Sequence, residues 1–351
     1  MRALRVVTLV VLSLCGFLVA SPSQAAVAKG TPCPTLNSVA VSGGLKFTCV
    51  KSGNKKVWNA GVRCTKPGVI MAVGLKNYSC DVVATKNVLT ETPYLWADEF
   101  NGSIAGPSST NWTPSYGTGW PLTGWGNNEL ESYEDYANRL DGSGSLVITA
   151  SRSKAMNGSN SGVMSEWVSG KITTVNRVNF LYGKLEARIQ IPSGAGTWPA
   201  FWMLGADYPT VPWPWSGEID IMEIKGSQPA VLWQTLHGPA GGGAKASLPN
   251  QNTYNAGVAL SSTYHTYGIQ WQPNQLSFTL DGQVISTVTS TQWASISSAD
   301  WPFNKPYYAI LNLAMGGNFA GGVSGSLNTA TMKVDWVRYS KFNGYGKVTL
   351  K

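Results

Sequence analysis

The chain has 351 residues, of which 43% are apolar and 13% are charged. This composition excludes a disordered protein, and 39 Gly and 19 Pro without helical heptads exclude a coiled coil and disfavour an all-helical bundle. The net charge of +8 is uneven: residues 27–92 hold nine Lys or Arg against two acids, and residues 93–351 hold 15 against 16. The large second part is nearly neutral, which argues against nucleic acid as a partner, because that would need a basic groove there.

The first 26 residues have the features of a secretory signal peptide. Two arginines precede an apolar run from Val6 to Ala20, and small residues follow at cleavage spacing. The run is short for a membrane span, and no other stretch is long and apolar enough to cross a bilayer. We place cleavage after Ala26, with Ala25 and Ala28 as alternatives, and expect a secreted, extracellular protein.

Residues 27–92 form a small cysteine-rich repeat module with a linker at its end. An offset of 31 residues aligns CPTLNSVAVSGGLKFTC with CTKPGVIMAVGLKNYSC, and each segment suggests two short strands around a glycine turn. Cys33, Cys49, Cys64 and Cys80 allow three disulfide pairings, and the 15-residue gaps disfavour the alternative of a zinc site. One bond per hairpin, 33–49 and 64–80, is the economical pairing.

The function of this module is left open between two readings. Its charge of +7 is suited to holding the protein on an anionic cell-wall polymer, and Trp58 or Tyr78 could stack on sugar. The alternative is a spacer without a binding function. Two disulfides would stabilise such a module, which is too small for a large core.

Residues 93–351 consist of short apolar or alternating runs between clusters of Gly, Pro, Asn and Ser. LEARIQI, within Tyr182–Ile191, alternates with period two, as in a strand with one exposed face. LSFTLDGQVISTV suggests a hairpin that turns at Asp281–Gly282. We therefore expect an all-β domain, a jelly-roll β-sandwich, although the pattern alone does not separate a sandwich from a barrel.

Three acids lie close together in the segment GEIDIMEI, residues 217–224. In a regular strand Glu218 and Asp220 share one face, whereas Glu223 points the other way. A β-bulge at Ile221–Met222 would absorb one residue and bring all three acids to the same cleft. Because crowded acids cannot all stay ionised, one would take a raised pKa and donate a proton, as glycoside hydrolysis requires.

The spacing of the acids alone leaves solvated acids, ion pairing and calcium binding open as alternatives. The surrounding sequence favours catalysis, because WPAFW and WPWSG bracket the acids with four Trp, and aromatic planes beside acids are suited to holding sugar rings. Some of these Trp are expected to fill core instead.

The motif GEIDIME resembles the active-site signature of family 16 glycoside hydrolases in its bulged form, Glu-x-Asp-x-x-Glu. The resemblance extends from Trp96 to Tyr339 through WGNNELESY, YGKLEARIQIP, GTWPAFWMLG, TLHGPAGGG, LNLAMGGN and VDWVRY, in the family's order. WPAFWMLG and HGPAGGG are most similar to the laminarinase branch. The resemblance implies an endo-acting hydrolase of β-1,3-glucan, with no cofactor needed for catalysis.

The resemblance also implies a role for each acid. Glu218 matches the nucleophile, Asp220 the acid that hydrogen-bonds and tunes it, and Glu223 the acid/base. The implied mechanism is a retaining double displacement through a covalent glycosyl-enzyme.

Substrate-binding positions follow from the same resemblance. They are Asn128, Trp198, Trp202, His237, Trp125 and Trp215. Packing is the alternative for Trp125 and Trp215, and a core imidazole for His237. The chain departs from the branch at Glu131–Ser132, where NNELQYY is common, which puts the exact subsite contacts in doubt.

Family members often bind one structural calcium ion on the face opposite the cleft. Asp335 matches the side-chain ligand, and Glu99 and Gly142 match residues that supply backbone oxygens. We expect a monomer whose partner is a β-glucan.

Three other functions remain as alternatives on the same scaffold. They are a mixed-linkage glucan or β-galactan hydrolase, a transglycosylase, and a β-glucan-binding lectin without activity. Hydrolysis by a nucleophilic Cys or Ser is disfavoured, because residues 93–351 contain no Cys and no Gly-x-Ser-x-Gly elbow.

Overall fold

The computed structural model describes residues 32–33, 35, 39–42, 45–52, 54–63, 70–73, 76–83, 86–119, 121–156, 164–240, 252–297 and 299–351. The predicted signal peptide lies outside these residues. Within them, no helix has the length and apolar character that a membrane span needs. The chain divides into two compact units, Met1–Arg63 and Cys64–Lys351. The boundary after residue 92, which the sequence predicts, stays a prediction.

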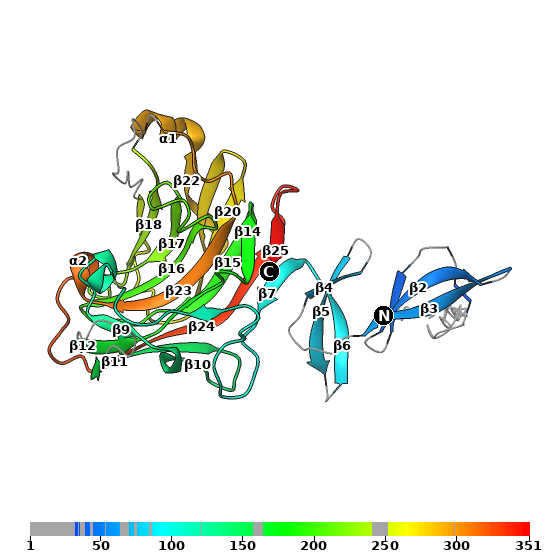
Figure 1. Ribbon diagram of the computed structural model, residues 1–351, viewed down its shortest axis with the longest axis horizontal. Helices are drawn as coiled ribbons and strands as arrows, with labels where there is room; N and C mark the ends of the chain where they lie inside the picture. The colour runs from blue at the N-terminus through cyan, green and yellow to red at the C-terminus, as the bar shows by residue number, and fades with distance from the viewer. Residues whose placement is uncertain are drawn as a thin grey trace, which may run out of the picture. The chain divides into compact units, whose positions relative to one another are not determined.

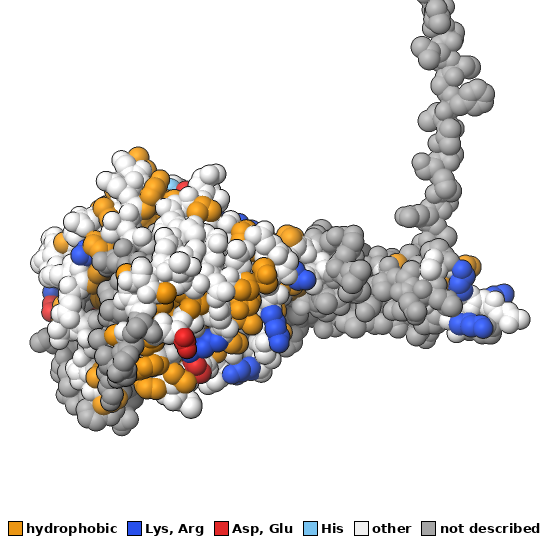
Figure 2. Space-filling model, turned by 90° about the horizontal axis from the view of Figure 1, so that it is seen from above, with side chains coloured by type: hydrophobic (Ala, Val, Ile, Leu, Met, Phe, Trp, Pro, Cys, Tyr) orange, Lys and Arg blue, Asp and Glu red, His pale blue; other side chains and the backbone are white. Residues whose placement is uncertain are grey.

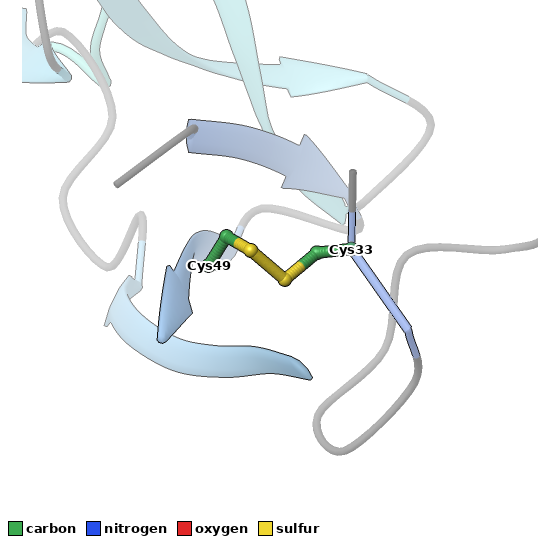
Figure 3. Close-up of a disulfide and its surroundings, with 2 residues drawn as sticks. All are labelled: Cys33 and Cys49. Atoms are coloured by element: carbon green, nitrogen blue, oxygen red, sulfur yellow. A yellow bond between two sulfur atoms is a disulfide. The ribbon is translucent and has the colours of Figure 1, made fainter. Parts of the chain in front are cut away.

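The first unit contains a three-stranded antiparallel sheet formed by β1 (Val39–Ser42), β2 (Leu45–Ser52) and β3 (Lys55–Arg63). A disulfide joins Cys33 to Cys49 on β2, which confirms this part of the predicted pairing (Figure 3). The two cysteines and Phe47 are buried and form the small core of the unit. The bond therefore stabilises a sheet that has few apolar side chains of its own.

The second repeat forms an equivalent sheet from β4 (Ile70–Val73), β5 (Lys76–Val83) and β6 (Lys86–Thr92). The bounds of β4 and β5 follow those of β1 and β2 at the predicted offset of 31 residues. The sequence predicts two strands per repeat, whereas each repeat has three. The added strand has a physical reason, because an isolated two-stranded hairpin is only marginally stable in water. The predicted bond between Cys64 and Cys80 lies outside the described residues.

Two larger sheets follow within the second unit (Figure 1). In the described residues, the first has ten strands: β22 (Gln283–Thr289), β21 (Gln275–Leu280), β20 (His265–Gln272), β15 (Gly183–Gln190), β24 (Thr329–Ser340), β11 (Leu146–Met156), β12 (Met164–Ser169) and β9 (Glu131–Tyr133) in spatial order, with β10 (Asn138–Leu140) on β11 and β7 (Tyr94–Asp98) on β24. Neighbouring strands are antiparallel except β12 and β9, which are parallel.

The second large sheet has nine strands in the described part of the chain. They are β19 (Asn252–Asn255), β18 (Val231–His237), β17 (Glu218–Glu223), β16 (Thr197–Gly205), β23 (Tyr307–Met315), β13 (Lys171–Thr173) and β8 (Thr113–Pro114), with β14 (Val178–Leu181) on β23 and β25 (Lys347–Leu350) on β14. The short helices are η1 (Thr123–Gly126), η2 (Asp135–Ala137), α1 (Ser290–Ile296) and α2 (Gly317–Ala320).

Apolar side chains from both large sheets form one core, as a β-sandwich requires. The predicted alternation is confirmed on β15, where Leu185, Ala187 and Ile189 are buried and the residues between them are half-buried. The hairpin β21–β22 turns at Asp281–Gly282, as predicted. Both residues have positive φ, +50° and +78°, as a tight two-residue hairpin turn needs. The all-β sandwich expected from the sequence is therefore the observed fold.

Candidate active site

The acid segment forms β17, near the middle of the nine-stranded sheet, and its pairing is irregular. Opposite β16, Met222 pairs with Phe201 and Asp220 pairs with Trp202, so Ile221 is left without a partner. The register to β18 shifts over the same residues. The predicted β-bulge at Ile221–Met222 is confirmed, and both of these side chains point into the core, fully buried.

As a result of the bulge, all three acids of β17 line one cleft over this sheet. The cleft has a volume of about 1260 Å³, and Glu218, Asp220 and Glu223 lie in its wall together with aromatic side chains from neighbouring elements. That volume exceeds the several hundred Å³ typical of a small-ligand pocket, so the cleft has room for a chain of sugar rings.

Two indoles hold the outer acids of the cluster in place. Trp198 Nε1 donates a hydrogen bond to Glu223 Oε1 at 2.9 Å, and Trp213 Nε1 donates to Glu218 Oε2 at 2.8 Å. Each bond favours the ionised form of its carboxyl group and fixes its orientation. The two glutamates are therefore positioned before any substrate binds.

The third acid, Asp220, lies between the two glutamates in the sequence, and its carboxyl group is close to the imidazole of His237. Asp220 is 3% exposed, and its Oδ2 lies 3.3 Å from Nε2 of His237 on β18. One donor atom each from Glu218, Asp220 and His237 lie within 4.8 Å of one another. His237 thus takes the place beside the acids that the sequence comparison implies for it.

Burial raises the pKa of all three carboxyls. It raises the pKa of Glu218 to about 8, with a further increase from the charge of Asp220, and His237 and the Trp213 hydrogen bond oppose the rise. The pKa of Glu223 is raised to about 7, again by burial first and then by Glu218. The pKa of Asp220 is raised well above its usual value by burial and by Glu223. Both glutamates therefore titrate near neutral pH, and these values, in which Glu218 is the more basic of the two, do not by themselves assign the proton donor.

A lysine also lines the cleft, among aromatic rings. Lys171 Nζ is 4.1 Å from the ring centroid of Trp125 and 5.0 Å from that of Trp202. Burial lowers its pKa, and the charges of Glu129 and Glu131 oppose that effect. Trp125 itself has a positive φ of +53°, a conformation that is costly for a bulky residue, so its cation–π contact with Lys171 helps to hold its indole in the cleft wall.

The departure from the family pattern at Glu131–Ser132 has a structural explanation. Glu131 is fully buried on β9, where its Oε2 accepts a hydrogen bond from the Met315 N–H at 2.8 Å. Burial and the charge of Glu129 raise the pKa of Glu131 well above its usual value. A neutral glutamic acid has the size of glutamine, and its carbonyl oxygen accepts and its hydroxyl group donates a hydrogen bond. It can therefore replace the Gln of NNELQYY without burying a charge.

Four of the six predicted substrate-binding residues line the cleft: Trp125, Trp198, Trp202 and His237. Asn128 does not belong to the described lining; it is exposed and donates from Nδ2 to Asn318 Oδ1 at 2.8 Å. The adjacent Asn127 lines the cleft instead and donates to Glu129 Oε1. The motif WGNNE gives no signal that separates the two, because the loop has no periodicity.

Trp215 is likewise not among the described residues that line the cleft, and Trp213 lies there in its place. The Trp215 carbonyl accepts a hydrogen bond from Lys305 Nζ at 3.2 Å. The sequence indicates an aromatic residue in WPWSG without showing which of the two indoles meets the acids.

The predicted calcium ligands lie on the other large sheet and its connections. Asp335 Oδ2 pairs with Arg188 Nη1 at 2.6 Å, and both carboxylate oxygens of Glu99 pair with Arg338 at 2.8 Å. Gly142 occupies a turn with a φ of +78°. Because a guanidinium already neutralises Asp335, its side chain is poorly suited to a calcium ion in this arrangement, and calcium binding stays a prediction.

Comparison with known proteins places these features in a family. Residues 137–338 match the model of glycosyl hydrolases family 16. The chain is 36% identical over 260 residues to glucan endo-1,3-beta-glucosidase A1 of Niallia circulans, which covers 70% of this chain but only 37% of that relative. It is 38% identical over 232 residues to glucan endo-1,3-beta-glucosidase of Cryptopygus antarcticus, covering 65% of this chain and 82% of the relative.

A solved structure agrees with this placement. The endo-beta-1,3-glucanase of Pyrococcus furiosus superimposes with a TM-score of 0.65 at 34% identity, covering 79% of this chain and 99% of that one. The similarity thus includes the sandwich and the cleft.

Proposed function

The chain belongs to glycosyl hydrolases family 16, and from this membership and its acid cluster we propose that it is an endo-acting hydrolase of β-1,3-glucan that retains anomeric configuration. The observation that carries the proposal is the bulged strand β17, which brings Glu218, Asp220 and Glu223 to one face of an aromatic-walled cleft. The proposed substrate is that of the two relatives named glucan endo-1,3-beta-glucosidase.

In the first step Glu223 donates its proton to the glycosidic oxygen while Glu218 attacks the anomeric carbon. The bond to the leaving sugar breaks, and a covalent glycosyl ester forms on Glu218. In the second step Glu223 takes a proton from water, the water oxygen attacks the anomeric carbon, and the Glu218 carboxylate leaves. The Trp213 indole stabilises the charge on Glu218 before attack and after release.

The substrate is tested by product chromatography on laminarin, barley mixed-linkage glucan, agarose and a β-1,3-galactan. We expect short β-1,3 oligosaccharides from laminarin. Release from a galactan without release from laminarin would keep the roles of the two glutamates and overturn the substrate.

The roles of the two glutamates are tested separately from the substrate. Glu223→Gln should lower hydrolysis by about 10²–10⁴-fold, the usual contribution of a general acid/base, and Glu218→Gln at least as much. Glu186→Gln is the matched control, because Glu186 lies on the other large sheet and pairs with Lys184. Unchanged turnover in either of the first two variants would contradict the assignment.

Azide rescue on an activated aryl glycoside distinguishes the two roles. In Glu218→Ala, azide enters the space of the nucleophile and gives a glycosyl azide of inverted configuration. In Glu223→Ala, azide attacks the glycosyl-enzyme and gives a product of retained configuration. The opposite pattern would exchange the two assignments.

We further propose that the protein is secreted and that the module of residues 27–92, which includes the sheet of the first unit, binds an anionic polymer of the cell wall. Residues 27–63 contain no Asp or Glu, and the described side chains of that unit show Lys or Arg on the face seen in Figure 2. Lys51 and Lys56 lie directly opposite each other on β2 and β3, beside the exposed Lys55. Like charges in such a pair repel, so an anion bound there would stabilise the sheet. N-terminal sequencing of protein from culture medium tests the cleavage after Ala26.

A further inference from the structure

The acid cluster contains three donor atoms whose spacing allows a second role beside hydrolysis. Glu218, Asp220 and His237 place two carboxylate oxygens and one imidazole nitrogen within 4.8 Å of one another. All three side chains are on adjacent strands, since Glu218 and Asp220 lie on β17 and His237 pairs with Glu218 from β18. In the described part of the chain, no other group of His, Cys, Asp and Glu has this spacing.

Asp220 supplies an independent sign of a missing partner. Its side chain is 3% exposed, and within the described residues its Oδ2 has no hydrogen-bond partner. The atom nevertheless lies 3.3 Å from His237 Nε2. A buried carboxylate oxygen without a hydrogen bond is costly, and its lone pair faces the space that the imidazole also faces.

This separation matches two ligands of one zinc ion. With Zn–N and Zn–O bonds of about 2.0–2.2 Å, neighbouring ligands of a tetrahedral site lie about 3.3–3.5 Å apart. Glu218 supplies the third ligand through one carboxylate oxygen, while its Oε2 accepts the hydrogen bond from Trp213. One imidazole with two carboxylates suits zinc or copper(II), whereas calcium and magnesium require more oxygen ligands.

We propose that Glu218, Asp220 and His237 form a binding site for a zinc-class divalent ion, with water as the fourth ligand, and that the ion excludes substrate. A bound ion would take the lone pair with which Glu218 attacks the sugar, and it would occupy the space of the reacting carbon. Such a site makes hydrolysis reversibly sensitive to zinc. The metal site itself depends only on the side-chain geometry, whether or not the proposed glucan is the substrate.

Metal binding is measured directly by calorimetric titration of the full chain with zinc chloride. We expect one ion per chain, and His237→Gln and Asp220→Asn should each weaken binding by about 100-fold or more, because each removes a ligand. His265→Gln is the matched control, since the sequence contains two His and His265 pairs with Asp281 at 2.7 Å, away from the acids. Equal affinity in wild type and His237→Gln would overturn the proposal.

Copper(II) identifies the ligand by spectroscopy and does not require an active enzyme. Electron paramagnetic resonance of the copper-loaded chain should show coupling to one nitrogen, lost in His237→Gln and kept in His265→Gln. Thermal unfolding of the metal-free variants identifies any variant that has failed to fold. In that case Glu218→Gln replaces another ligand and should weaken metal binding to the same extent. Nitrogen coupling that survives in His237→Gln would place the ion elsewhere and reject the site.

Discussion

Trp213 and Trp215 lie two residues apart, and their contacts predict different consequences of substitution. The Trp213 indole donates to Glu218 at 2.8 Å and lowers the pKa of that carboxyl against the effect of burial. Because a hydrogen bond to a charged group contributes about 1.5–3 kcal/mol, Trp213→Phe should lower kcat/KM by about 10–100-fold. Trp215→Phe, which leaves that bond intact, should have no such effect. Steady-state kinetics on laminarin compares the two, and equal losses would contradict the role given to Trp213.

The raised pKa values predict that the carboxyl cluster reduces stability at neutral pH. A carboxyl whose folded-state pKa is raised binds protons more tightly in the folded state, so stability falls as pH rises from the unfolded value of about 4.5 to the folded value. For Glu218 and Glu223 these windows end at about 8 and about 7. Glu218→Gln should therefore raise Tm relative to wild type by about 10 °C at pH 8, and by much less at pH 4.5. Calorimetric scans at both pH values test this, and a Tm difference independent of pH would contradict it.

Single residues in loops were the least predictable part of the site. The acids could be located from sequence because strand periodicity and a short motif constrain them, and the same holds for Trp198 and Trp202 on β16. Asn128 and Trp215 lie in irregular segments, where no period indicates which of two similar neighbours faces the cleft. There the direction of a side chain depends on tertiary contacts, such as the bond between Asn128 and Asn318.

At the level of elements, the bulge in β17 makes a prediction about chain length. Deleting Ile221, the residue without a partner opposite β16, would leave a regular strand in which both glutamates and Asp220 still alternate onto the cleft face. We expect this variant to fold and to lose about 10²-fold in activity, as for a misplacement of about 1 Å. Inserting Ala after Ile221 should instead abolish hydrolysis, because Glu223 turns toward the core if the bulge persists and moves about 6.6 Å along the strand if the bulge is lost. The rate of laminarin hydrolysis is measured for both variants, with near-ultraviolet circular dichroism as the folding control. A higher rate in the insertion variant than in the deletion variant would contradict the bulge model.

Elements were predictable where local pattern and burial agree. The alternation in β15 and the Asp281–Gly282 turn follow from side-chain period and positive φ, and both are observed. The third strand of each repeat is not predicted, because the aligned segments end at Cys49 and Cys80, before the third strand begins. β6 begins 31 residues after β3, with Lys86 and Val88 in the places of Lys55 and Val57, so the repeat extends into the third strand although Leu89 stands in the place of Trp58.

For the whole molecule, the positive charge and the cleft lie in different parts of the chain, which suggests that the two parts bind different polymers. The lining of the cleft runs from Thr113 to Phe319, entirely within residues 93–351, whose net charge is near zero. The excess of positive charge belongs to residues 27–92. A neutral catalytic domain is suited to an uncharged polysaccharide, and a basic segment to an anionic surface, so the two parts can act on different polymers.

Removing residues 27–92 tests this division. The truncated protein should hydrolyse soluble laminari-oligosaccharides at the rate of the full chain, because no residue of the described cleft lining is lost. It should no longer be retained on an anionic polymer such as teichoic acid at low salt. The matched variant Lys51→Glu, Lys55→Glu, Lys56→Glu keeps the chain length and reverses the charge of three exposed side chains, so it should also lose retention and keep activity. A collapse of activity on the soluble oligosaccharides would mean that the front of the chain helps to build the site, whereas unchanged retention in both variants would mean that it is a spacer.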